Sequence, residues 1–431
     1  MPWGCKSSPV RLSALGLSGY AWRWVRLFPD STRLRAGQTR LKTEPWVPIQ
    51  SILDNDLYKF TMMNAVLRHY PDAEVEYRFF DRDPRGGYNE AFLQGFRRQL
   101  DQLAEMRLQA EEVAYIRDRL DVLDRPDFLA YLHDYRFNPD ELDFRIDDQG
   151  QFHLRVRGLW SQTILWEVPL LAAITEQYFI HCDTNWTLDD QARMADGKST
   201  ALSQGGCLFA DFGTRRRRNP QSQEIFIRQA MGKTGFTGTS NLHFARVFDL
   251  MAIGTMAHEW IMGVSGLEGL PHANQRALQR WIEIYEGRLG IALTDTFGLD
   301  AFLADFDPVL ARTLDGVRHD SGDPFAFGDR IIRHYESIGI RPDTKTIVFS
   351  DGLDVEKALA IQRYFKGRIR LSFGIGTHFT NDFPGSEPIH VVLKMWSIDG
   401  VPVIKLADDP GKVHGDPEAL RAGRWLLRPA G

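Results

Sequence analysis

Ionisable side chains are closely grouped in the segment RHDSGDP, residues 318–324. Arg318 can neutralise an anion, and Asp320 can accept hydrogen bonds from sugar hydroxyls or contact a magnesium ion. Asp323 provides a second carboxylate, the type of oxygen ligand that magnesium prefers. An Asp-Ser-Gly turn that begins a helix has the same composition, so the spacing fits both a binding site and a purely structural turn.

His258 follows small and apolar residues in the segment IGTMAHEW. A lone histidine is more often structural than chemical, and the absence of HExxH or a close Cys/His set in the sequence disfavours zinc. A nucleophilic histidine needs a neutral ring nitrogen that faces a cleft and an acid that holds the other nitrogen. Asp295, at the end of the next predicted strand, is suitably placed to be that acid.

Four consecutive arginines, residues 215–218, follow Asp211 and Phe212 in DFGTRRRRNP. Arginine offers a planar fork of donors that suits phosphate and carboxylate, and Phe212 can stack on a flat ring. A solvated basic run is the alternative, whereas a formal net charge of -5 disfavours a nucleic-acid patch. The register stays open by one residue, with Arg215 as the first candidate.

Glycines and small polar residues follow other predicted strands. SFGIGT contains Gly374 and Gly376, and late loops of barrels commonly bind phosphate through backbone N–H groups. Gly352, in the preceding loop, can support such a site. GKTGFTGTSN is not a Walker A motif, because Ile227 stands where that motif needs glycine, but its end leaves Ser240 as a polar strand end.

The segment DNDLYKF places Asp56, Tyr58 and Lys59 at the start of a predicted helix. A helix cap followed by an amphipathic surface is the simpler interpretation of these residues, and a functional role is the alternative. Asp54 or Asp56 is expected to cap this helix.

The elements that must position these residues show two different sequence patterns. From residue 207, short apolar runs that end in small or polar residues alternate with helical patterns, which is typical of parallel strands joined by helices. Seven such units predict an irregular (β/α) barrel or an open doubly wound sheet, with the active site at the carboxyl ends of the strands. The markers of these ends are Asp211, Ser240, Thr255, Asp295, Asp320, Asp351 and Gly376.

The remainder predicts an α+β domain built from both ends of the chain. We expect a helix within residues 51–71, a strand at 74–80, helices within 93–135 and a hairpin at 142–158. Strands near 389–396 and 401–407 should pair with the first region. The predicted divisions are a disordered extension (1–45), an N-terminal α+β domain (46–205), a catalytic barrel (206–384) and C-terminal strands (385–431).

Composition restricts the class of protein. The 431 residues include 43% hydrophobic and 25% charged side chains, which is ordinary for a soluble globular protein. Three widely spaced cysteines fit a reducing compartment, so we expect a cytoplasmic location. The longest apolar stretch, residues 160–180, contains two glutamates, so neither a membrane segment nor a membrane partner is expected.

Taken together, several segments resemble the nicotinate phosphoribosyltransferases, a type II phosphoribosyltransferase family, in its bacterial branch. They occur in the family's order across residues 48–412 and are LDNDLYKFTM, LWEVPLLAAITE, DFGTRRR, GTSN, IGTMAHEW, RHDSGDP, VFSDGLD, FGIGT and IKLADDPGK. The resemblance implies an ATP-dependent, ligase-type enzyme of NAD salvage. It would join nicotinate to 5-phosphoribosyl 1-diphosphate (PRPP), giving nicotinate mononucleotide and diphosphate.

The resemblance also implies roles for the catalytic residues. His258 occupies the position of a histidine that ATP transiently phosphorylates, and Asp295 would orient its ring. Asp320 would hold ribose hydroxyls. Magnesium would enter with PRPP or diphosphate near Asp320, so a separate protein metal site is not expected.

Further roles concern the substrates. Phe212 would stack on the pyridine ring, with Tyr58 approaching from a neighbouring subunit, which implies a homodimer with shared active sites. Arg318 would bind near the nicotinate carboxylate, which Ser240, unlike an acid there, would not repel. Arg215 would bind phosphate or diphosphate, and Gly374 and Gly376 would receive the 5′-phosphate with Gly352 beside them.

Other functions stay open at this point. One is a related transferase that uses nicotinamide or quinolinate without ATP. Another is a barrel hydrolase such as a glycosidase, with Asp295 and Asp320 as acid and nucleophile. A third is a catalytically inactive ligand sensor.

Overall fold

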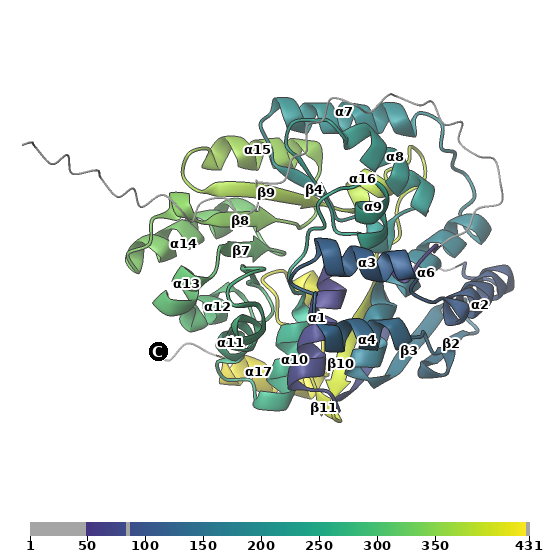
Figure 1. The fold of residues 1–431 in the computed structure, drawn as a ribbon, viewed down its shortest axis with the longest axis horizontal. Helices are drawn as coiled ribbons and strands as arrows, with labels where there is room; N and C mark the ends of the chain where they lie inside the picture. Colours follow the sequence, from purple (N-terminus) through teal and green to yellow (C-terminus); the bar gives the residue numbers. More distant parts are fainter. Residues whose placement is uncertain (1–48, 83–86, 428–431) are drawn as a thin grey trace, which may run out of the picture. The chain divides into compact units, whose positions relative to one another are not determined.

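The parallel strands form one six-stranded sheet in the computed structural model, which describes residues 49–82 and 87–427 (Figure 1). Their spatial order is β5-β4-β9-β8-β7-β6. The strands are β4 (Phe209–Asp211), β5 (Phe236–Thr239), β6 (Ile291–Leu293), β7 (Gly316–His319), β8 (Thr346–Phe349) and β9 (Arg370–Ile375). Each coincides with an apolar run that was predicted to be a strand, so these six predictions are confirmed.

Helices connect consecutive parallel strands, as the alternating pattern predicts. They are α8 (Pro220–Ala230), α9 (Leu242–Val247), α10 (His258–Glu268), α11 (Ala273–Tyr285), α12 (Leu299–Asp305), α13 (Pro308–Thr313), α14 (Pro324–Ser337) and α15 (Val355–Phe365), and the short α16 (Thr377–Thr380) follows β9. Because parallel strands all run the same way, their carboxyl ends meet at one edge of the sheet. The loops at this edge carry most of the predicted site residues.

The predicted seventh strand, in AIGTM, does not form. Ala252 makes only an isolated parallel bridge with Thr239, and the Ile253 N–H donates to the Thr239 carbonyl over 2.9 Å. Toward β6, the link is a side-chain bond from Thr255 Oγ1 to the Ile291 carbonyl, 3.1 Å long. The segment therefore runs between the two edge strands without a continuous ladder, so the regular sheet has six strands.

Both ends of the described chain build a second, antiparallel sheet, as predicted. Its order is β11-β10-β1-β3-β2, with β1 (Glu74–Asp81), β2 (Leu142–Ile146), β3 (Phe152–Leu159), β10 (Val391–Ile398) and β11 (Val401–Pro402). The hairpin β2–β3 and the pairing of β1 with β10 confirm the expected long-range contact. The helix α17 (Pro417–Leu426), where only strands were expected, follows β11.

The remaining helices lie in the first half of the chain. They are α1 (Leu57–His69), α2 (Glu90–Glu105), α3 (Ala110–Arg119), α4 (Pro126–Asp134), α5 (Trp160–Thr163), α6 (Glu167–His181) and α7 (Gln191–Gln204). In α2, buried Phe92, Phe96, Leu100 and Leu103 recur at helical spacing, which explains the leucine-rich pattern.

The expected side-chain cap of α1 is wrong. Asp56 occupies the N-cap position, but its side chain makes no cap hydrogen bond and instead accepts from Ser240 Oγ over 2.8 Å. Asp54 pairs with both terminal nitrogens of Arg217, at 2.8 and 2.7 Å. Both carboxylates therefore bind partners that are distant in the sequence, which local pattern alone does not reveal.

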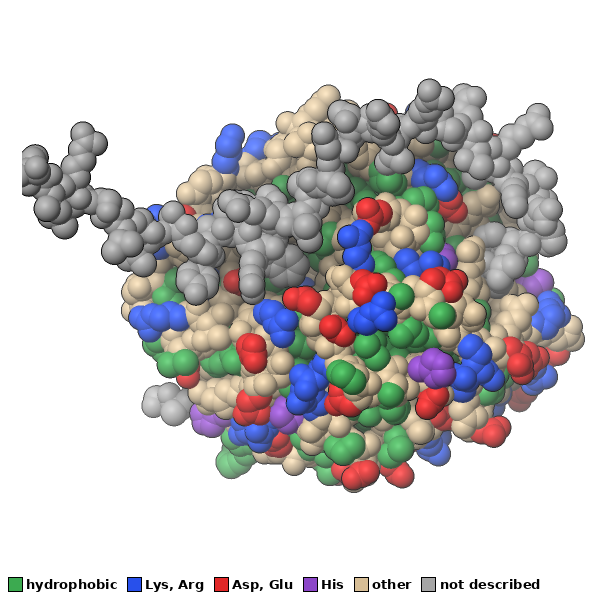
Figure 2. Space-filling model, in the orientation of Figure 1, with side chains coloured by type: hydrophobic (Ala, Val, Ile, Leu, Met, Phe, Trp, Pro, Cys, Tyr) green, Lys and Arg blue, Asp and Glu red, His purple; other side chains and the backbone are tan. Residues whose placement is uncertain are grey.

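The burial of apolar segments and the distribution of surface charge concern the predicted location and partners. Among the described residues, no helix has the length and apolar character needed to cross a membrane. The apolar stretch 160–180 lies almost wholly in the core, as α5 and α6. On the face shown in Figure 2, basic and acidic side chains are interspersed and do not gather in one basic patch.

The predicted extension, residues 1–45, falls outside the described residues. All described residues belong to one compact unit, Val47–Gly431. The proposed domain boundaries at 205 and 384 stay predictions.

The close pairing of β7 with β8 makes a stability prediction. A Cβ atom at Gly316 would lie 1.9 Å from the backbone oxygen of Thr346, whereas one at Gly197 in α7 would meet nothing within 4 Å. We expect Gly316→Ala to lower the free energy of unfolding by about 1–3 kcal/mol through overpacking. Gly197→Ala should raise it by about 0.5–1 kcal/mol through helix propensity. Urea unfolding measures both, and an unchanged Gly316→Ala midpoint would contradict the packing.

Candidate functional site

A cavity of about 430 Å³ lies between the carboxyl ends of the parallel strands and the antiparallel sheet. It brings together all but one of the residues to which the family resemblance assigns a role. Those on its wall are Tyr58, Phe212, Arg215, Ser240, His258, Arg318, Asp320, Gly352, Gly374 and Gly376. The exception is Asp295, which lies behind His258 and is only 1% exposed.

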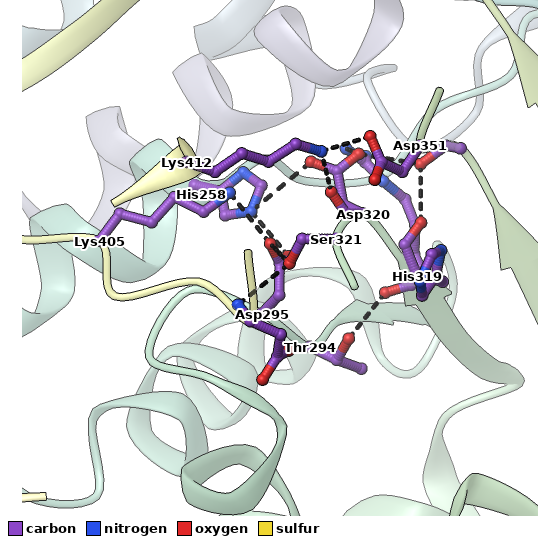
Figure 3. A network of polar contacts seen from close by, with 12 residues as sticks. His258, Thr294, Asp295, His319, Asp320, Ser321, Asp351, Lys405 and Lys412 are labelled. Carbon is purple, nitrogen blue, oxygen red and sulfur yellow. Dashed lines mark hydrogen bonds and ion pairs between the residues drawn. The ribbon is translucent and has the colours of Figure 1, made fainter. Parts of the chain in front are cut away.

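His258 is held from behind by Asp295. The His258 ring nitrogen Nε2 lies 2.8 Å from Asp295 Oδ1. The second oxygen of Asp295 contacts Ser321 Oγ at 2.7 Å and Lys405 Nζ at 3.0 Å, as Figure 3 shows. His258 starts α10 on the cavity wall, and the Nδ1 atom of its ring has no hydrogen-bond partner among the described residues. This is the arrangement that a nucleophilic histidine requires.

The surroundings of His258 favour a neutral imidazole. Its pKa is lowered to about 4, because burial and the charge of Lys405 outweigh the opposing effect of Asp295 and Asp320. Burial alone would raise the pKa of Asp295, but its contacts with His258, Lys405 and Ser321 lower it well below its usual value. An ionised Asp295 accepts a hydrogen bond from Nε2–H, so the free lone pair of the ring lies on Nδ1.

Asp320 also approaches Nε2 of the imidazole. Its Oδ1 contacts Arg318 Nη2 at 3.4 Å and Ser350 Oγ at 3.0 Å, and its Oδ2 lies 3.7 Å from His258 Nε2. His258, Asp295 and Asp320 are close enough together to hold a metal ion. However, Lys405 and Ser321 already occupy the second oxygen of Asp295, so a cation carried by a ligand fits best beside Asp320.

Asp323 does not belong to this group. Its Oδ1 accepts the backbone N–H of Ala326 over 2.7 Å and so caps α14. The structural interpretation of that aspartate is therefore correct, and its interpretation as a magnesium ligand is wrong.

Two aromatic rings mark one end of the cavity. A Cβ atom at Gly374 would lie 2.2 Å from the Phe212 ring, so the glycine makes room for that ring. The buried Tyr58 hydroxyl has no hydrogen-bond partner among the described residues, which is expected of a group that awaits a ligand. Tyr58 was expected to come from a neighbouring subunit. Tyr58 lines the cavity of its own chain, and its approach to a neighbouring subunit stays a prediction.

The structure resolves which arginines face the cavity. Arg215 and Arg216 line it. Arg217 is buried in its pair with Asp54, and the guanidinium of Arg218 lies 3.5 Å from the centre of the Phe179 ring. The last two arginines therefore have structural roles, and Arg215 keeps the place predicted for it.

Four cations on the wall were missed in the sequence. They are Arg82, Lys394, Lys405 and Lys412. Lys405 and Lys412 reach in from the C-terminal segment (Figure 3), where Lys412 bonds Asp351 and the Asp320 carbonyl. Both lie in IKLADDPGK, so the motif was recognised but its charged residues were not assigned.

The crowding of these cations indicates an anionic ligand. Burial lowers the pKa of Lys394 to about 7, helped by the nearby charges of Lys405, Arg215 and Arg82. Burial and the neighbouring Arg215 and Arg82 likewise lower the pKa of Arg216 to about 9. Phosphate or carboxylate groups would relieve this repulsion.

The charge balance around His258 makes a prediction for its titration. We expect the ring to stay neutral between about pH 5 and pH 8, where an ordinary histidine titrates. Lys405→Met should raise the pKa of His258, because the lysine lowers it. Histidine-selective ¹⁵N NMR measures both, with Lys345→Met as the matched control, because Lys345 is a buried lysine directly before β8 and does not line the cavity.

The sign of the linkage gives an independent check. Because the folded pKa of about 4 lies below the usual 6.5, the unfolded state binds the proton first. The free energy of unfolding should therefore fall as the pH drops through this window, and less steeply when His258 is replaced by Asn. A wild-type His258 that titrates near its usual pKa would contradict the account.

Comparison with known proteins agrees with this geometry. Residues 207–427 match the model of the nicotinate phosphoribosyltransferase (NAPRTase) family, and residues 53–175 match the model of the NAPRTase N-terminal domain. The chain is 42% identical over 400 residues to the nicotinate phosphoribosyltransferase of Methanosarcina mazei, covering 88% of this chain and 98% of that protein. It is 45% identical over 381 residues to the one of Desulforapulum autotrophicum, covering 86% and 97%.

A solved structure has the same architecture. The crystal structure of nicotinate phosphoribosyltransferase from Porphyromonas gingivalis aligns with a TM-score of 0.84 at 36% identity, over 88% of this chain and 99% of that one. The matches extend over both sheets and the cavity between them. The chain therefore belongs to the nicotinate phosphoribosyltransferase family.

Proposed function

We propose that this chain transfers the 5-phosphoribosyl group of PRPP to nicotinate, with coupled hydrolysis of ATP, in the salvage of NAD. The products are nicotinate mononucleotide and diphosphate. The observation that carries the proposal is His258, which is backed by Asp295 and opens onto a cavity with two aromatic rings and many cations. The names of its relatives support the same activity.

His258 is the group that ATP phosphorylates in this proposal. Its Nδ1 lone pair attacks the terminal phosphorus, the bond to the bridging oxygen breaks, and ADP leaves with the electron pair. Asp295 stabilises the positive charge that develops on the ring through Nε2–H. Water later takes the phosphoryl group from His258, which frees phosphate and returns the neutral ring.

The transfer step needs a charged leaving group to be neutralised. The pyridine nitrogen of nicotinate attacks ribose C1 as the bond to diphosphate breaks, through a transition state with oxocarbenium character. Arg215, Arg216 and Lys394 are placed to stabilise the departing diphosphate, and Asp320 to accept from ribose hydroxyls. Magnesium carried by the diphosphate would lie beside Asp320 and add positive charge at the leaving oxygens.

The pyridine base and the 5′-phosphate would contact the remaining walls of the cavity. Phe212 and Tyr58, which both line the cavity, would hold the pyridine ring, and Arg318 would bind the carboxylate. Burial raises the pKa of Asp56, the partner of Ser240, which lessens the repulsion between this carboxyl and nicotinate. Gly374 and Gly376, with Gly352 nearby, would receive the 5′-phosphate.

The proposal also covers the barrel form of the fold, the oligomeric state and the cellular location. The segment 251–255 links β5 to β6, which supports an irregular barrel. A homodimer and a cytoplasmic location complete the proposal. The glycosidase alternative is not favoured, since both oxygens of Asp295 are already engaged.

Product formation tests the activity. Purified protein with PRPP and Mg²⁺ should form mononucleotide from nicotinate and not from nicotinamide, and ATP should stimulate the reaction. His258→Ala should abolish the stimulation and keep slow ATP-independent transfer, because it removes the phosphorylated group and leaves the substrate walls. Lys345→Met, remote from the cavity, should retain ATP stimulation.

The same assay identifies the alternatives. Equal product with and without ATP in the wild type would remove the role of His258. Preference for nicotinamide would overturn the specificity that we assign to Ser240 and Asp56. No mononucleotide from either base would overturn the transferase itself.

A further inference from the structure

Lys59 is a fully buried lysine beneath the cavity that the proposed chemistry does not use. It lies in α1 with none of its side chain exposed. Its Nζ contacts Glu167 Oε2 at 2.6 Å and also bonds Glu259 Oε2. Burial lowers the pKa of Lys59, but the two carboxylates outweigh burial and raise it, so the ammonium group stays charged.

Glu259 is one of the two carboxylates and directly follows His258. Its other oxygen accepts from the Tyr77 hydroxyl over 2.6 Å and from Trp160 Nε1 over 2.8 Å. With Lys59 on Oε2, both oxygens of Glu259 are occupied. Glu259 is thus fixed in place. Loss of its contact with Lys59 would leave a buried charge without a partner.

Glu167 is the second carboxylate and connects Lys59 to the cavity. Its Oε1 lies 3.3 Å from Arg215 Nη1, while Lys59 holds its Oε2. Burial alone would raise the pKa of Glu167, but Lys59 and Arg215 together lower it to about 2, so the carboxylate stays ionised.

The contact between Glu167 and Arg215 is incomplete. Arginine and a carboxylate prefer two parallel hydrogen bonds, which need both carboxylate oxygens. Because Lys59 holds one of these oxygens, Arg215 makes a single long bond to the other. Among the described residues this is the one hydrogen bond of the Arg215 guanidinium, and its remaining N–H groups stay available on the cavity wall.

We propose that Lys59 is a positioning residue that keeps Arg215 available to the diphosphate group. By holding Oε2 of Glu167, it prevents the bidentate pair that would turn the guanidinium away from the ligand. The inference rests on the proposed function, in which Arg215 binds diphosphate, and it adds the residue that maintains that capacity.

Calorimetric binding of inorganic diphosphate with Mg²⁺ tests this inference without turnover. Lys59→Met should raise the dissociation constant by about tenfold or more, the loss of a charge-assisted hydrogen bond. Glu167→Gln should bind diphosphate as tightly as wild type or more tightly, because the competing charge is gone. The double variant Lys59→Met/Glu167→Gln should recover most of the affinity. Lys345→Met is the control for removal of a buried lysine.

Each outcome decides between explanations. If Lys59→Met melts normally and binds like wild type, or if the double variant is no tighter than Lys59→Met, the inference is overturned. If Lys59→Met does not fold, Glu167→Gln and the double variant still test it, and weakened binding by Glu167→Gln would overturn it. Wild type that binds no diphosphate would instead overturn the role of Arg215 in the proposed function.

Discussion

The site depends on the carboxylate of Asp295, both oxygens of which have hydrogen-bond or ion-pair partners. It is almost wholly buried, and an ionised group there persists only when every oxygen has a partner. Those partners come from three distant parts of the chain: His258 from α10, Ser321 after β7, and Lys405 from the C-terminal segment. The contact with Asp295 orients the imidazole, while burial and the charge of Lys405 keep it neutral.

Each of the two sheets supplies a different part of the cavity wall. Loops at the carboxyl ends of the parallel strands supply His258, Asp320 and the glycines, whereas the antiparallel sheet and the segment after it supply Lys394, Lys405 and Lys412. Pairing of β1 with β10 is therefore a requirement of the site as well as of the fold. A cavity assembled in this way concentrates positive charge in a confined space, which suits a substrate with several phosphates.

Much of this was predictable from the sequence, for a physical reason. Apolar runs that end in Asp, Ser or Gly identified six parallel strands, and the residues at their ends do converge. Partners remote in sequence were not predictable: Asp54 with Arg217, Asp56 with Ser240, and Lys59 with its two glutamates. Local pattern placed Asp56 as a cap and Lys59 on a surface, because only the folded chain brings their true partners near.

The central claim is that Asp295 holds Nε2 of His258 and leaves Nδ1 to react. The most direct test is to phosphorylate the protein with ATP and identify the isomer of phosphohistidine by ³¹P NMR, with the residue located by peptide mapping under alkaline conditions. The account predicts phosphate on Nδ1 of His258. Phosphate on Nε2, or on no histidine at all, would contradict it.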